Sequence, residues 1–207
     1  MRKTRRGEPE VRPLRGCRPL SEAEVSAVLE ALTGPNALRD RALWILGVRS
    51  GFRISEILSL RLRDVFQSGR ILERVTVPRR YMKRKAEGRT VLLHPAAREA
   101  LRAWITALEA RGQGGPDRVT FPSRKGTNRP IGRRQAWRIL REAFEGAELV
   151  GNLGTHTMRK TFADRLYDRL GGDLVKLQKA LGHRSILSTA AYVSFREEEI
   201  DAAILSV

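Results

Sequence analysis

The chain has one cysteine, few aromatic residues and no long apolar run. Because Cys17 stands alone, an intrachain disulfide and a cysteine-rich zinc site are excluded. The longest apolar stretch, Ala42–Val48, is far too short to cross a bilayer, and the first residues, MRKTRRGEPEVRP, lack the apolar segment of a secretory signal. Aromatic residues make up 6% of the chain, and no predicted helix opposes a broad apolar face to a basic one, as membrane anchoring requires. The sequence therefore predicts a cytoplasmic protein without a membrane partner.

Acidic residues are also scarce relative to basic ones. The 207 residues include 40 lysines and arginines against 23 aspartates and glutamates, a formal net charge of +17. A surplus of this size indicates a polyanionic partner, and nucleic acid is favoured because the membrane signals are missing. No cluster of carboxylates is spaced to hold magnesium, so we expect no metal and no other cofactor.

Apolar periodicity predicts a mainly α fold with a small antiparallel β-sheet, an α+β protein of one sizeable domain. Helices are expected near residues 21–32, 38–48, 96–111, 132–148, 155–170, 174–181 and 195–207, with a short helix from Ser185 that carries Tyr192. Strands are expected at 74–77 and 89–93 around a basic turn, and a short edge strand at 119–122. The predicted buried faces include Leu38 in the second helix and Trp137 in the 132–148 helix.

Local signals mark the ends of several of these helices. Ser21 and Glu24 form a capping box, and Gly182 is expected to stop the 174–181 helix. Thr155 is expected to cap the 155–170 helix, whose apolar stripe steps by four residues. His156 and Arg159 would lie one turn apart at the edge of that stripe and face outward together.

Residues 1–17 form a basic segment interrupted by glycine and proline. Its basic residues are Arg2, Lys3, Arg5, Arg6, Arg12 and Arg15. This composition predicts a flexible tail in the free protein. The same charges would suit an arm that becomes ordered on DNA phosphates, and the two interpretations are compatible.

Two histidines, an arginine and a tyrosine near the end of the chain suit chemistry on a phosphodiester. His183 follows the predicted helix end at Gly182, and Tyr192 lies nine positions after it. Taken singly, a histidine or a tyrosine is more often a structural residue than a catalytic one. The spacing of the whole set is what favours a functional interpretation.

The same segments resemble a known family. They read His156-Thr157-Met158-Arg159-Lys160, Leu181-Gly182-His183 and Tyr192. This pattern resembles the boxes H-x-L-R-H, L-G-H and Y of the tyrosine recombinase (phage integrase) family, with Lys160 as a mild departure. Far upstream, Ser50–Leu58 is similar to the family's first box, T-G-x-R-x-S-E-L, and it matches that box at Gly51, Arg53, Ser55 and Glu56. Agreement of both boxes is hard to reach by chance.

The resemblance implies a catalytic role for each matched residue. Arg53 and Arg159 would neutralise the scissile phosphate, and Glu56 would hold Arg53 in place. His156 is the candidate base for the phenol of Tyr192. Tyr192 would be the nucleophile and would hold the DNA as a 3′-phosphotyrosine.

The resemblance also implies two proton donors. His183 would donate a hydrogen bond to a phosphate oxygen. A lysine on the β-hairpin would protonate the leaving 5′ oxygen, and Lys83 is favoured over Lys85 because it would lie at the end of a strand rather than in the turn.

Further basic residues are expected to contact DNA. They are Arg79, Arg80, Arg84 and Lys85 of the basic turn, Arg133, Arg134 and Arg138 of the 132–148 helix, and Lys160. A basic helix face taken alone is usually only solvated. With a net charge of +17, contact of this face with the DNA backbone or the major groove is favoured.

The resemblance covers residues 18–207, which we interpret as the family's catalytic domain after the 1–17 tail. The family usually carries a separate N-terminal helical domain that clamps the duplex, and about 20 residues cannot build one. We expect either a naturally minimal recombinase or a fragment of a longer chain, and Met1 with the basic tail favours the former. The terminal helix, Phe195–Val207, would pack into a neighbouring protomer of a tetramer or on its own domain.

The implied function is site-specific recombination of double-stranded DNA. The enzyme would be prokaryotic or encoded by a phage or mobile element, and would break and rejoin strands without a metal during integration, excision, inversion or resolution. A type IB topoisomerase uses a similar residue set, but it relaxes supercoils without preferring a site. A DNA-binding regulator that has lost catalysis is a second alternative, although none of the expected catalytic positions is substituted. A basic RNA- or ribosome-binding protein fits the composition but leaves the two boxes unexplained.

Overall fold

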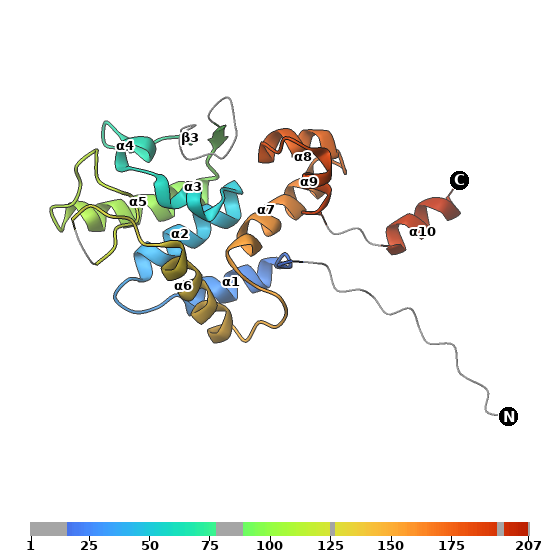
Figure 1. The fold of residues 1–207 in the computed structure, drawn as a ribbon, viewed down its shortest axis with the longest axis horizontal. Helices are drawn as coiled ribbons and strands as arrows, with labels where there is room; N and C mark the ends of the chain where they lie inside the picture. Colours follow the sequence, from blue (N-terminus) through green and yellow to red (C-terminus); the bar gives the residue numbers. More distant parts are fainter. Residues whose placement is uncertain (1–15, 78–88, 125–126, 194–196, 207) are drawn as a thin grey trace.

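The computed structural model describes residues 16–77, 89–124, 127–193 and 197–206, which form a mainly helical body with two small antiparallel sheets (Figure 1). The predicted fold class is therefore confirmed. The elements are α1 (Glu22–Ala31), α2 (Ala37–Ser50), α3 (Ile54–Ser59), α4 (Leu62–Val65), β1 (Phe66–Gln67), β2 (Arg70–Ile71), β3 (Arg74–Val77), β4 (Arg89–Leu92), α5 (Pro95–Glu109), α6 (Arg133–Gly146), α7 (Thr155–Arg169), α8 (Leu174–Leu181), α9 (Ile186–Ala190) and α10 (Glu197–Leu205). Of the expected flexible tail, all but residues 16 and 17 lies outside the described ranges.

Helix α2 forms the centre of the core, where it packs against α5 and α7. Its Trp44 is fully buried, donates a hydrogen bond from Nε1 to the Val25 carbonyl oxygen at 3.2 Å, and meets the Phe144 ring edge-on. The prediction that Leu38 faces the core is wrong, because its side chain is 45% exposed. Leu38 lies in the first turn of α2, where the helix has just left the α1–α2 turn and its outer side faces solvent.

Strands β3 and β4 pair antiparallel as predicted, with Val75 opposite Val91. The expected edge strand at 119–122 is not a continuous strand. Val119 makes an isolated bridge to Arg61, and Pro122 makes another to Pro130. Proline has no backbone donor, so two prolines cannot extend a ladder in this segment.

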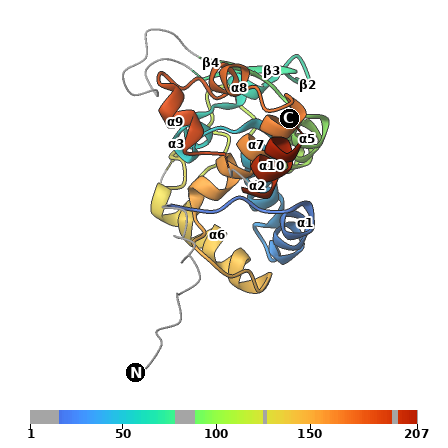
Figure 2. The ribbon, with the colours of Figure 1, turned by 90° about the vertical axis from the view of Figure 1, so that its right-hand side faces the viewer.

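Helices α1 and α6 lie side by side at the end of the body opposite β3 and β4, as Figures 1 and 2 show. The prediction that Trp137 of α6 faces the core is wrong, because its side chain is 42% exposed and the Arg141 guanidinium lies 5.5 Å from its ring centre. The buried face of α6 consists of Ala136, Ile139, Leu140, Ala143 and Phe144. Trp137 therefore lies among exposed basic residues.

Helix α7 joins the main core to a smaller apolar cluster formed with α8 and the segment after α9. It approaches α2 closely, since a Cβ atom on Gly47 would collide with Met158, and one on Gly51 with the Phe162 ring. The expected cap at Thr155 is displaced by one residue, because Thr155 is already helical and the cap position is Gly154.

Helix α8 begins and ends at residues whose local sequence predicts those ends. Asp173 caps α8 by accepting a hydrogen bond from the Lys176 amide at 2.8 Å, and Gly182 ends the helix in the left-handed conformation, at φ 60°. Tyr192 lies in a turn just after α9 rather than on the helix, where its amide donates to the Thr189 carbonyl at 2.9 Å.

Helix α10 stands apart from the body at the right of Figure 1. Its side chains Ile200, Ile204 and Leu205 are exposed. Within the described residues, no helix combines the length and the apolar character needed to cross a membrane.

Candidate active site

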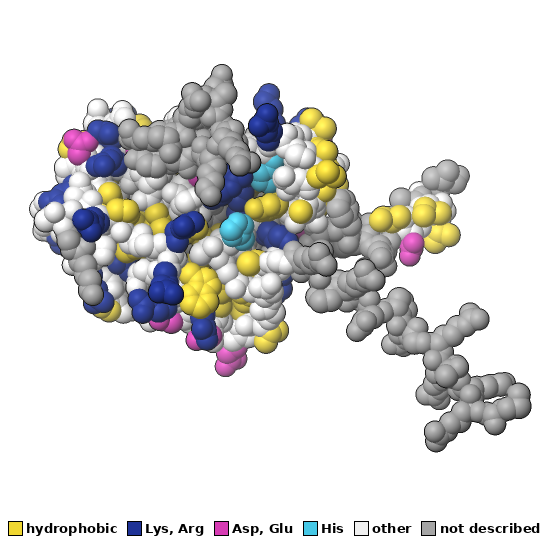
Figure 3. Space-filling model, viewed as in Figure 1, with side chains coloured by type: hydrophobic (Ala, Val, Ile, Leu, Met, Phe, Trp, Pro, Cys, Tyr) yellow, Lys and Arg dark blue, Asp and Glu magenta, His cyan; other side chains and the backbone are white. Residues whose placement is uncertain are grey.

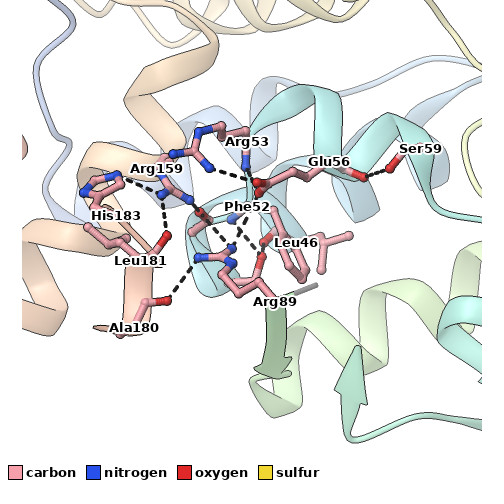
Figure 4. A network of polar contacts seen from close by, with 12 residues as sticks. Leu46, Phe52, Arg53, Glu56, Ser59, Arg89, Arg159, Ala180, Leu181 and His183 are labelled. Carbon is pink, nitrogen blue, oxygen red and sulfur yellow. Dashed lines mark hydrogen bonds and ion pairs between the residues drawn. The ribbon is translucent and has the colours of Figure 1, made fainter. Parts of the chain in front are cut away.

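The site is built around Arg159, whose side chain is only 1% exposed (Figure 4). Its guanidinium donates to the Gly51 carbonyl oxygen, to the Leu181 carbonyl oxygen at 2.7 Å and to His183 Nε2 at 2.9 Å. The expectation that His156 and Arg159 face outward together is therefore wrong for Arg159. His156 is exposed, whereas Arg159 is buried because two backbone carbonyls and an imidazole take up its donors.

Arg53 and Glu56 meet as the first box predicts. The left-handed Gly51, at φ 62°, ends α2, and Arg53 then occupies the cap position of α3. Glu56 accepts hydrogen bonds from the Arg53 amide at 2.8 Å and from the Arg53 guanidinium at 2.9 Å. Burial by itself would raise the pKa of Glu56, but the Arg89 charge and the Arg53 amide hydrogen bond outweigh burial and lower that pKa. Glu56 is thus buried and ionised, and it holds the Arg53 guanidinium in place.

Arg89 belongs to the same network and was missed by the sequence analysis. Its guanidinium lies 3.6 Å from Glu56 Oε2, donates to the Ala180 carbonyl at 3.1 Å and reaches the Gly51 carbonyl at 3.4 Å. Burial lowers the pKa of Arg89, and the Glu56 charge partly restores it. One signal was available, because alternation in the 89–93 strand places Arg89 on the same face as Leu93, which is buried.

Tyr192 lies beside this network. Its half-buried ring is 4.9 Å from the His183 ring, centre to centre, and the Arg159 guanidinium lies 5.7 Å from the Tyr192 ring centre. Burial, together with the Arg53 and Arg89 charges, lowers the pKa of Arg159 to about 9, so the guanidinium stays protonated at neutral pH. A fixed cation thus faces a phenol.

The two histidines carry different hydrogen-bonding constraints. Because an arginine only donates, His183 Nε2 accepts from Arg159, and a neutral ring then carries its proton on Nδ1, 3.1 Å from Thr189 Oγ1. Desolvation of part of the His156 ring lowers the pKa of His156, and the charges of Arg159, Arg53 and Lys160 lower it further. His156 is therefore mainly neutral at pH 7, as a proton acceptor must be.

The other predicted residues are placed as follows. Arg133, Arg134 and Arg138 are exposed on α6, whereas Lys160 is only 8% exposed on α7. Arg79, Arg80, Lys83, Arg84 and Lys85 lie outside the described residues. Figure 3 shows arginine and lysine side chains gathered on the same face of the body as histidine side chains. Over the described ranges, no three His, Cys, Asp or Glu side chains are grouped as a metal site would need.

The fold is that of a tyrosine recombinase catalytic domain, and solved structures share it. The chain matches the XerA recombinase structure with a TM-score of 0.73 and 21% identity, over 94% of this chain and 66% of that one. It matches the XerH site-specific recombinase bound to palindromic difH substrate, a post-cleavage complex, with a TM-score of 0.69 and 25% identity, over 90% of this chain and 51% of that one.

The chain belongs to the phage integrase family, whose model matches residues 18–199. It is 32% identical over 193 residues to the probable integrase/recombinase YoeC of Bacillus subtilis, covering 93% of this chain and 94% of that protein. It is 29% identical over 186 residues to the tyrosine recombinase XerD of Corynebacterium glutamicum, covering 87% of this chain. The chain spans only 58% of the length of that XerD.

Proposed function

We propose that this protein is a site-specific DNA recombinase that breaks and rejoins strands through a 3′-phosphotyrosine on Tyr192. The observation that carries the proposal is the convergence of Arg159, His183 and Tyr192, since one guanidinium donates to the histidine and lies over the tyrosine ring. Membership of the phage integrase family and the DNA-bound XerH neighbour support DNA as the substrate. The relatives above are bacterial proteins, so we place this activity in the cytoplasm of a prokaryote, encoded by its genome or by a mobile element.

The proposed reaction is an in-line exchange at phosphorus. Tyr192 Oη forms a bond to the scissile phosphorus while the bond from phosphorus to O5′ breaks. The phenol proton passes to His156, and O5′ takes a proton from a lysine, with Lys83 preferred to Lys85. Attack by a 5′-hydroxyl then reverses these steps and releases Tyr192. Because one phosphoester replaces another, the cycle needs no external energy source.

The arginines would stabilise the charge that develops on the non-bridging oxygens. Arg53 is half-buried and held by Glu56, so its guanidinium is both oriented and reachable. Arg159 Nε is buried and has no hydrogen-bond partner in the described part of the chain. Leaving such a donor unsatisfied costs about 1–3 kcal/mol, and a phosphate oxygen would satisfy it.

The test is a trapping experiment with nicked suicide duplexes tiled across the DNA around the protein's own gene. Loss of the short 3′ fragment prevents rejoining, so a covalent protein–DNA band accumulates on a denaturing gel. Site-restricted adducts support a recombinase. Relaxation of any supercoiled plasmid without strand exchange would favour the topoisomerase alternative, and specific binding without an adduct would favour a DNA-binding regulator.

We propose that α6 presents its basic face to DNA. Arg133, Arg134 and Arg138 are exposed beside the exposed Trp137, a combination of cations and a stacking surface that suits a nucleic acid. Each phosphate contact contributes about −0.9 to the slope of log affinity against log salt. The double substitution Arg134→Ala/Arg138→Ala is therefore expected to make this slope shallower by about 1–2. The measurement is a fluorescence anisotropy titration at salt concentrations from about 50 to about 200 mM.

A matched control for that titration is Arg102→Ala. Arg102 lies on α5, where its guanidinium donates to the Gly69 carbonyl at 2.7 Å and covers the Phe66 ring. The control should leave the slope unchanged. An unchanged slope in the α6 double variant would show that this face is only solvated.

We propose that α10 packs into a neighbouring protomer and so holds a tetramer together on DNA. Its exposed Ile200 and Ile204 need a cover, and its sequence, EEEIDAAIL, is acidic. A groove of about 760 Å³ on the body has an apolar wall of Val48, Phe162 and Leu166, which suits the apolar face of α10. Its edge carries charges of both signs, which are Arg49, Arg165 and Arg169 with Glu22 and Asp168. The alternative is packing on its own domain.

Replacing both isoleucines of α10 with aspartate tests the tetramer. For Ile200→Asp/Ile204→Asp, we expect DNA-bound complexes to stop at one or two protomers in mass photometry. The rate of single-site adduct formation should stay within about three-fold of the parent, because within the described residues the two isoleucines share no contact with the residues proposed to cleave DNA. Tetramers of unchanged abundance would contradict packing in trans.

A further inference from the structure

Arg89 lies outside both family boxes, yet it is among the few charged side chains of the body that are buried, at 7% exposure. It begins β4, and its guanidinium lies 5.1 Å from the Phe52 ring centre. A buried guanidinium without partners would destabilise the fold, so its position depends on the groups that it contacts. Those groups all belong to the candidate active site.

The contacts of Arg89 duplicate those of the two arginines assigned to the phosphate. Glu56 pairs with Arg53 at 2.9 Å and with Arg89 at 3.6 Å. The Gly51 carbonyl accepts from Arg159 and also from Arg89. Arg89 thus shares one acceptor with each of the two residues (Figure 4).

A third contact extends the network to the histidine segment. Arg89 donates to the carbonyl of Ala180, and Arg159 donates to that of the adjacent Leu181. These two carbonyls end α8 just before His183. The last turn of α8 is therefore held by two arginines that arrive from different elements, β4 and α7.

Charge explains why Arg89 matters to the other two. Glu56 is a single buried carboxylate surrounded by Arg53, Arg89 and Arg159. With a neutral side chain at position 89, Glu56 would lose one of its two buried cations and the Gly51 carbonyl would keep only Arg159. The remaining guanidinium groups would then be free to redistribute around Glu56.

We propose that Arg89 is a positioning residue that fixes Arg53 through Glu56 and Arg159 through the Gly51 carbonyl, without touching DNA itself. This inference rests on the proposed strand-cleavage function. It assigns to β4 a part in shaping the phosphate-binding pair, in addition to whatever residues 78–88 contribute.

The test compares two substrates that differ at the scissile position. One duplex carries the natural phosphodiester and the other a methylphosphonate, in which a methyl group replaces one non-bridging oxygen and removes the negative charge. Misplaced arginines should slow attack on the charged phosphorus far more than attack on the neutral one. For Arg89→Met we expect adduct formation to fall about 30-fold on the phosphodiester and less than about 3-fold on the methylphosphonate.

Two further variants keep the test decisive. Arg89→Lys retains the charge but not the planar fork, so we expect the rate of adduct formation to fall about 10-fold on the phosphodiester alone. This variant can be measured even if Arg89→Met does not fold. Arg39→Met removes another buried arginine, paired with Asp40 at 2.8 Å on α2, and should change both substrates by the same factor. Circular dichroism melting reports the folded fraction of each variant.

The outcomes separate the two levels of inference. Equal losses on both substrates for the Arg89 variants would overturn the positioning role and leave the proposed function intact. A wild-type protein that forms no adduct with either substrate on any duplex would overturn the proposed function, and the role of Arg89 with it.

Discussion

Replacing Tyr192 with phenylalanine is expected to abolish the covalent protein–DNA adduct while DNA affinity stays within about two-fold. The substitution removes Oη, the only protein atom proposed to attack phosphorus, so adduct formation should fall by at least about 10⁴. Phenylalanine keeps the ring that packs against His183 and Arg159, and the fold should therefore persist. The measurement is the suicide-duplex gel with the 5′ end of the cleaved strand labelled, alongside an anisotropy titration on the same duplex.

Tyr167→Phe is the matched control. Tyr167 is also half-buried, but it lies on α7 against Gly172, and its hydroxyl has no proposed part in the chemistry. The adduct should form at the parental rate in this variant. An adduct that persisted in Tyr192→Phe would assign the nucleophile to another residue.

Arg159→Lys is expected to lower the rate of adduct formation by about 10²–10³, the cost of losing one preorganised donor to a developing oxyanion. A lysine ammonium has no planar fork, so it cannot serve the Gly51 and Leu181 carbonyls and His183 in the present geometry. The freed buried carbonyls should also destabilise the fold by about 1–3 kcal/mol. Single-turnover rates at saturating protein, with urea unfolding of the same samples, measure the two effects separately.

Arg39→Lys provides the comparison for that loss. Arg39 is also buried, at 6% exposure against 1% for Arg159, and it has its own carboxylate partner, Asp40, but no contact with His183 or Tyr192 is seen among the described residues. A similar loss of stability without a loss of rate is expected. If Arg159→Lys lost no more rate than this control, Arg159 would be a structural residue.

Most elements of the fold could be predicted because their signals are local. The capping box at Ser21 and Glu24 forms as expected, and Gly182 ends α8 with a positive φ. Leu38 and Trp137 were assigned wrongly for one shared reason. Periodicity identifies the side of a helix on which a residue lies, but the width of the buried face depends on the neighbouring elements, which periodicity does not contain.

The candidate site, too, could be predicted only where its contacts are local in the sequence. The motifs identified the candidate catalytic residues. Arg53 and Glu56 meet because they are three positions apart on one turn. The burial of Arg159 could not be predicted, since its acceptors Gly51 and Leu181 are 108 and 22 residues away along the chain. Arg89 was missed because it pairs with Glu56 only after β4 docks beside α3, and its strand alternation alone named no partner.

Because the Gly51 carbonyl accepts from Arg159, the candidate site is completed late in synthesis. During synthesis, a growing chain acquires Arg53 and most of its basic residues long before Arg159, and Tyr192 comes later still. Chains that end before Arg159 therefore lack both the second arginine and the tyrosine of the proposed chemistry. Under the proposed chemistry, the chain can cleave DNA only after the segments that carry Arg159 and Tyr192 have folded. Arg159 must then bond to the carbonyl of Gly51, a residue made about a hundred positions earlier.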